Sequence, residues 1–129
     1  MELTTANHIE QALKEYDRVK EELNRPQEDL VMIAACELVK KSMTDFLVAF
    51  LSEKGMDSFE QQDLLQLQSM CMTFDVRFAD LDLSSIACLS EEDSMAYTND
   101  LEDQRLAGYV KTLDRLRDLV LEILGTPAA

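Results

Sequence analysis

One long apolar-periodic run, from Pro26 to Lys54, constrains the fold of this chain more than any other stretch. Proline suits the first position of a helix, where its missing N–H would be unpaired, and Lys54 followed by Gly55 is a typical helix end. One stripe of this run carries Val31, Ala35, Leu38, Ser42 and Phe46, and Val39, Met43, Leu47 and Phe50 broaden it. The sequence therefore predicts a central helix whose apolar face is wide enough to contact more than one neighbouring helix.

Two further helices are expected at the ends of the chain, where apolar residues recur at intervals of three and four. The first runs over residues 5–23, and the last starts at Asn99 or Asp100 and runs to Leu124. Gly125 and Pro127 follow the last helix, as expected at a helix end. The glycine inside it, Gly108, would fit a close approach of another backbone.

The segment after Gly55 predicts a third main helix and one short helix. A Ser58-x-x-Gln61 spacing has the form of a capping box, and the apolar row that follows includes Phe74 and Phe78. Residues 84–89 are expected to form the short helix. The chain has only 3 Gly and 2 Pro, too few for the many turns of an all-β fold. We therefore expect an all-α protein: residues 1–129 as a single antiparallel bundle of four main helices and one short one.

The charge of the chain is strongly negative, with a net value of −14. Residues 43–104 contain 14 Asp and Glu against two cations, Lys54 and Arg77. Such a surface repels phosphate backbones, so no direct nucleic-acid binding is expected. Two interpretations of the acidic middle remain open: a solvated, solubilising surface, and a nucleic-acid mimic that inhibits a basic partner protein.

The three cysteines, Cys36, Cys71 and Cys88, lie among apolar neighbours with no C-x-x-C pair. They are expected to be buried free thiols in a reducing compartment, which favours a cytoplasmic protein. Residues 1–25 are polar and amphipathic, unlike a signal peptide. No uncharged apolar run of about 18 residues is present, so no membrane span is expected.

Motifs for chemistry are few. His8 is the one histidine, and nothing in the sequence places a nucleophile beside it. The Glu-x-x-His pairs of di-iron bundles and the Cys/His spacings of zinc sites are absent, so no metal or cofactor is expected. No pair of carboxylates stands out in an apolar setting that would drive their pKa values apart. The sequence therefore predicts no catalytic residues and no enzyme activity.

One spacing resembles a calcium-binding loop. Asp80, Asp82, Ser84 and Glu91 occupy positions 1, 3, 5 and 12 of an EF-hand-like segment. The position that needs glycine holds Ser85, and large apolar residues would be exposed between the ligands. The favoured interpretation is a helix end followed by a short apolar helix that covers the bundle.

Four segments, in order, resemble those of a known family. LVAFLSEKG (47–55) is similar to the end of a long second helix and its glycine turn, and QQDLLQL (61–67) to a segment that often starts with His-Asp-Leu. AYTND (96–100) is similar to an Arg-Tyr-Pro-Asp-like turn, and AGYVKTLDRLRDLVLEIL (107–124) to the last helix. Over residues 30–124 the chain thus resembles the HEPN family of helical-bundle domains.

The departures from that family concern its chemistry. Gln62 stands where the histidine is expected, Ala96 at the arginine and Thr98 at the proline. RNase-type members carry an Arg-x4-6-His motif, and here no arginine precedes His8. Cleavage of that type needs a proton-transferring histidine and a cation near the phosphate. The resemblance therefore implies a non-catalytic, HEPN-like accessory module.

The resemblance also implies partners. Family members commonly form homodimers and often work beside a nucleotidyltransferase. We therefore expect a homodimer, with Met32, Cys36 and Met43 of the central helix as candidate interface residues. An alternative is a nucleotide or other small molecule between helices, with Gln62, Tyr97 and Tyr109 as wall residues.

Overall fold

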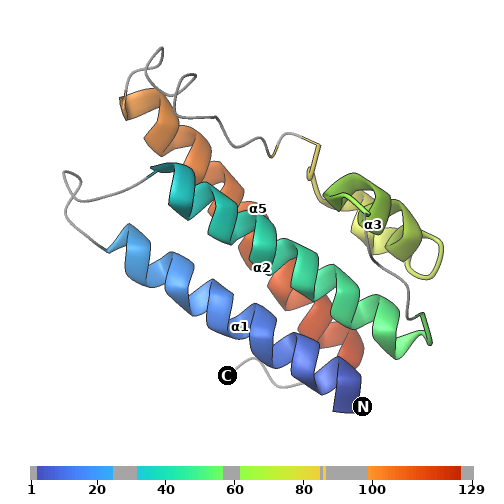
Figure 1. The fold of residues 1–129 in the computed structure, drawn as a ribbon. Helices are drawn as coiled ribbons and strands as arrows, with labels where there is room; N and C mark the ends of the chain where they lie inside the picture. The colour runs from blue at the N-terminus through green and yellow to red at the C-terminus, as the bar shows by residue number, and fades with distance from the viewer. Residues whose placement is uncertain (1–2, 25–31, 57–61, 85, 87–98, 126–129) are drawn as a thin grey trace.

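The computed structural model describes residues 3–24, 32–56, 62–84, 86 and 99–125. Its elements are α1 (Leu3–Leu23), α2 (Met32–Glu53), α3 (Leu64–Met72), the 3-10 helix η2 (Val76–Asp80) and α5 (Asn99–Leu124). Over these residues there is no strand, which confirms the all-α helical bundle. Figure 1 shows α1, α2 and α5 side by side, with α1 antiparallel to α2, while the shorter α3 lies at one end.

The helices α1 and α5 form where the apolar periodicity predicts them, and α2 ends as predicted, while its predicted start at Pro26 lies outside the described residues. In α1 the buried positions include Ile9, Ala12 and Val19, and α5 buries Leu106, Val110, Leu113, Leu116 and Val120. The spacing of three and four places each set on one face of its helix. Gly55 (φ +86°) and Gly125 (φ +71°) adopt the left-handed conformation that glycine tolerates best, and each follows the end of a helix.

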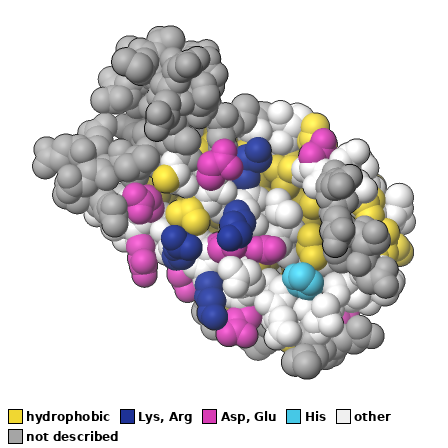
Figure 2. Space-filling model, in the orientation of Figure 1, with side chains coloured by type: hydrophobic (Ala, Val, Ile, Leu, Met, Phe, Trp, Pro, Cys, Tyr) yellow, Lys and Arg dark blue, Asp and Glu magenta, His cyan; other side chains and the backbone are white. Residues whose placement is uncertain are grey.

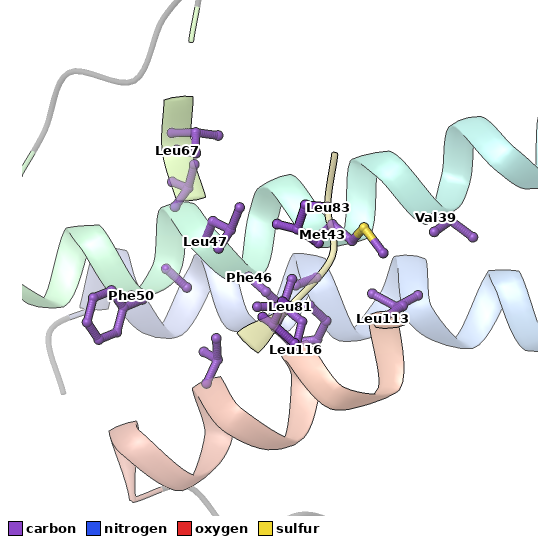
Figure 3. Close-up of a cluster of buried hydrophobic side chains, with 14 of the residues drawn as sticks. Val39, Met43, Phe46, Leu47, Phe50, Leu67, Leu81, Leu83, Leu113 and Leu116 are labelled. Carbon is purple, nitrogen blue, oxygen red and sulfur yellow. The ribbon is translucent and has the colours of Figure 1, made fainter. Parts of the chain in front are cut away.

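The central helix α2 is buried over most of its circumference, because α1, α3 and α5 all pack against it. Its fully buried side chains come from several faces: Val39, Met43, Phe46, Leu47, Ala49, Phe50 and Leu51. Figure 3 shows several of them with Leu67, Leu81, Leu113 and Leu116 of the surrounding segments. Among the described helices, none is both long and apolar enough to cross a membrane.

This burial corrects the predicted interface on α2. Met43 is completely buried inside the chain, and Cys36 is only 7% exposed. Neither side chain is available to a second molecule, because both are covered by the chain itself. Met32 is the first residue of α2, and its side chain lies outside the described part of the structure. The wide apolar face of the central helix therefore serves the bundle's own core.

The third helix begins and ends differently from the prediction. It is capped by Asp63, whose carboxylate accepts the Gln66 N–H at 2.8 Å while its own N–H donates to Gln66 Oε1 at 2.8 Å. The expected cap, Ser58, lies outside the described residues. The helix ends at Met72, before the predicted apolar row is complete.

A short 3-10 helix that the sequence did not predict follows α3. The Asp75 carboxylate accepts the Arg77 N–H at 3.0 Å and so starts η2 at Val76. In the segment predicted to be helical, residues 84 and 86 are not in a helix, and 85 and 87–89 lie outside the described residues. Most of the segment predicted as the short helix therefore lies outside the described residues, and η2 begins at a side-chain cap rather than at an apolar repeat.

The cysteines divide into two kinds. Cys71 is a fully buried free thiol, and burial raises its pKa to about 12. Cys36, in contrast, is disulfide-bonded, so the prediction of a free thiol is wrong there. Cys88 lies outside the described residues. The number of cysteines could not show which thiols the fold brings together. Cys36 therefore no longer supports the argument from free thiols to a reducing compartment.

Candidate functional site

The residues proposed as a ligand site are not brought together by a contact. Gln62 is exposed ahead of α3, whereas Tyr109 is half-buried on α5 and packs against the core. The structure has no hydrogen bond or ring contact between these two described residues. Tyr97, the third residue of the proposed wall, lies outside the described residues.

The segment with the calcium-like spacing contributes side chains to the hydrophobic core. Leu81 and Leu83, which alternate with its acidic residues, are buried in the hydrophobic cluster. Asp82 accepts a hydrogen bond from the Ser84 hydroxyl at 2.9 Å, and Glu91 lies outside the described residues. No group of metal-ligating side chains is found within the described ranges. Leu81 and Leu83 cover the bundle as the favoured interpretation expected, but residues 81–84 are not helical, and residues 85 and 87–98 lie outside the described residues.

Four large apolar side chains are exposed on α3 and the segment that follows it. They are Leu65 (46% exposed), Met72 (40%), Phe74 (48%) and Val76 (75%), and we call them the α3–η2 patch. Leu65 and Met72 are seven residues apart, so they lie on the same face of α3. Figure 2 shows hydrophobic side chains exposed on the side of the molecule where α3 lies, and charges of both signs interspersed over the middle of that face.

The sequence did not predict this patch. Its apolar row continued through Phe74 as if α3 went on, which would have turned Phe74 toward the core with Phe78. Because α3 ends at Met72, Phe78 is fully buried while Phe74 remains half-exposed. The signal that was available is the Asp75-Val76-Arg77 stretch, whose aspartate can cap a new helix.

The base of the α3–η2 patch is firmly held. The buried Gln68 donates two hydrogen bonds from Nε2, to the carbonyl oxygens of Phe78 and Leu81, each at 2.8 Å. The ring of Phe78 lies 4.7 Å from that of Phe50 in α2, and the ring of Phe74 lies edge-on to Phe50 at 6.2 Å. Hydrogen bonds and ring contacts therefore fix the exposed residues on a packed support.

Acidic side chains surround this patch in the sequence. Residues 62–84 contain Asp63, Asp75, Asp80 and Asp82 against a single cation, Arg77, a net charge of −3. The Arg77 guanidinium forms a fork with the Asp75 carboxylate, with Nη2–Oδ2 at 2.8 Å and Nε–Oδ1 at 3.1 Å. These hydrogen bonds lower the pKa of Asp75. Arg77 is thus paired with Asp75, Lys54 also acts on Asp75, and the other three carboxylates of this stretch remain exposed.

A second feature that the sequence analysis missed is a carboxyl pair between α1 and α2. Glu15 is 1% exposed, and its Oε1 accepts from Gln11 Nε2 at 3.0 Å and lies 3.3 Å from Lys41 Nζ. Its Oε2 is buried and receives no hydrogen bond from an N–H or hydroxyl group. The neighbour that reaches Glu15 is the carboxyl of Asp45 on α2.

These two carboxyls are hydrogen-bonded to each other and share one proton. Burial, the hydrogen bond to Glu15 and the charge of Glu15 raise the pKa of Asp45 to about 7. Burial also opposes ionisation of Glu15, but hydrogen bonds from Asp45, Gln11 and Lys41 outweigh it and lower the pKa of Glu15. Asp45 therefore holds the proton and Glu15 the charge. The signal in the sequence was Glu15 itself, three residues after Ala12 and four before Val19 in the buried stripe of α1.

A polar cluster joins α1 to α5. The Tyr16 hydroxyl donates to Asp114 Oδ1 at 2.6 Å, and Lys20 Nζ lies 3.2 Å from the same oxygen. The Arg117 guanidinium lies over the Tyr16 ring, 5.1 Å from its centroid. Burial and the Asp114 carboxylate raise the pKa of Tyr16. This cluster holds two helices together, which is a structural role.

Comparisons of the chain with protein-family models, with curated proteins and with solved structures found no match.

Proposed function

We propose that this bundle is a protein-interaction module of the HEPN-like, non-catalytic type, and that it binds its partner through the α3–η2 patch. The observation that carries this proposal is the exposure of four large apolar side chains on one firmly held segment. Large apolar side chains that are exposed together on one segment are typical of interaction sites on soluble proteins. Aromatic and Met side chains are also enriched where proteins meet, and the patch contains Phe74 and Met72.

The alternatives have less support from the described residues. A nucleotide site rests on Gln62, Tyr97 and Tyr109, of which Tyr97 lies outside the described residues. A net charge of −14 also disfavours a phosphate-bearing ligand. A homodimer through α2 would need side chains that the chain itself covers, such as Met43. The departures of Gln62 and Ala96 from the family's motif positions support a binding role over catalysis.

Site-specific photo-cross-linking in cells tests this function. A photoreactive benzoylphenylalanine at Val76, which is 75% exposed, is expected to give one discrete protein adduct on irradiation. The matched control places the same group at Ala107, an exposed position of α5 outside the patch, where no such adduct is expected. The proposal fails if Val76 gives no adduct, or if both positions give the same set of adducts.

A further inference from the structure

We infer that the occupant of the α3–η2 patch is a basic amphipathic helical segment of a partner protein; this inference rests on the proposed interaction function. It is drawn from the charge around the patch and from the patch's shape. The carboxylates of Asp63, Asp80 and Asp82 are exposed on the same stretch of chain as the patch. Of the two cations that act on Asp75, Arg77 is paired with it, and Lys54 Nζ lies over the Phe50 ring, 5.5 Å from its centroid. A segment that brings lysine or arginine side chains to these carboxylates would gain complementary charge at its rim.

The shape of the patch favours a helix as the binding segment. Leu65 and Met72 lie two helical turns apart on one face of α3, a separation of about 10 Å along the axis. Phe74 and Val76 follow the end of α3 in the chain and are exposed as well. A partner helix presents apolar residues at intervals of three, four and seven, so two of its turns span the same length. Its polar face would then carry the cations that meet Asp63 and Asp80.

A second copy of this chain fits the patch poorly. Each copy carries a net charge of −14 and would bring its own acidic rim against that of its partner. Four side chains also supply much less than the roughly 800 Å² per partner that a stable protein interface buries. A short segment needs less area, because the binding free energy is concentrated in a few central anchors. Charge and area thus both favour a basic segment over self-association.

The test uses two designed helical peptides, each about 18 residues long. One is built of Leu and Lys with an amphipathic pattern, and the other replaces every Lys with Glu. Fluorescence anisotropy measures the binding of each to the full chain, to the double variant Leu65→Ser/Val76→Ser, and to the control Ala107→Ser. Because Leu65 and Val76 are exposed, the double variant is expected to fold, which circular dichroism checks.

The Leu/Lys peptide is expected to bind the unmodified chain and the control about tenfold more tightly than the double variant. Raising NaCl from about 0.05 M to about 0.5 M should weaken this binding severalfold, since the Debye length shortens. The Leu/Glu peptide should not bind. Equal binding of the Leu/Lys peptide to the double variant would overturn the inference, because the peptide would then be held by negative charge elsewhere. Binding of both peptides alike would overturn the assignment of a basic partner.

Two outcomes separate this inference from the proposed function. If sedimentation shows a dimer that Leu65→Ser/Val76→Ser dissociates, a second copy is the occupant, so the basic segment is wrong while the patch remains an interaction site. If the adduct at Val76 contains a protein without a basic amphipathic helix at the cross-linked position, the basic segment is again wrong and the patch remains an interaction site. If Val76 gives no adduct, the proposed function itself fails.

Discussion

A variant in which Asp replaces Phe46 is expected to show no cooperative unfolding transition. Phe46 is completely buried in α2, in the same cluster as Leu113 and Leu116 of α5. Removing a buried Phe side chain costs about 3–5 kcal/mol, and placing a carboxylate in the same apolar site adds several more. The free energy of unfolding of a domain of this size is only about 5–15 kcal/mol, so the expected loss is comparable to the total stability. Urea titration followed by circular dichroism measures it.

The matched control is Ala34→Asp, which introduces the same charge on an exposed position of the same helix. This variant should unfold at nearly the urea concentration of the unmodified chain. Cys36→Asp is expected to resemble Phe46→Asp more than the control, because Cys36 is 7% exposed and disulfide-bonded. A folded Phe46→Asp protein, or an equal loss at Ala34, would contradict the burial of α2.

Asp45→Asn is expected to flatten the dependence of stability on pH. The pKa of Asp45 is raised from 3.8 to about 7 in the folded chain, so between these values folding takes up a proton. The stabilising effect of that proton is complete at pH values below the pKa of Asp45 in the unfolded chain. It is lost as the pH rises through the pKa of Asp45 in the folded chain. The pKa of Glu15 is lowered, so the contribution of Glu15 to the pH dependence of stability lies at more acidic pH, outside this window.

The amide that Asp45→Asn introduces would stay neutral at every pH and could donate to Glu15 Oε2. Because Asp45 is only half-buried, solvent screening reduces the effect, and we expect a difference of about 1–2 kcal/mol at pH 8 in favour of the variant. At pH below 4 the two proteins should be nearly equal. Urea unfolding over this pH range measures the difference, with the exposed Asp17→Asn as control. Parallel pH profiles for the unmodified chain and Asp45→Asn would mean that no proton is shared.

The periodicity of the sequence was sufficient for the long helices but not for what surrounds them. The stripes of α1 and α5 and the stop at Gly55 were predicted correctly, because amphipathic spacing and glycine geometry act locally. The end of α3 was wrong, since it depends on a competing cap at Asp75 that apolar spacing does not register. That error hid the exposure of Phe74, and with it the α3–η2 patch.

The buried charges could not be assigned from the sequence of one helix alone. Glu15 lies in the buried stripe of α1, but the reason it is tolerated there comes from Asp45 and Lys41, on another helix. The burial of Cys36 and Met43, two of the three residues predicted as an interface on α2, has a related cause. Width of an apolar face shows that a helix has several neighbours, but it does not show whether those neighbours belong to the same chain.

The most direct test of the α3–η2 patch is hydroxyl-radical footprinting of the protein, purified and inside its host cells. In the purified protein, Met72 and Phe74 should be oxidised readily, while the fully buried Met43 is protected. In cells, Met72 and Phe74 should be oxidised severalfold less, whereas labelling of His8 on α1 should not change. If Met72 and Phe74 are oxidised equally in both settings, no partner covers the patch and the proposed function is wrong.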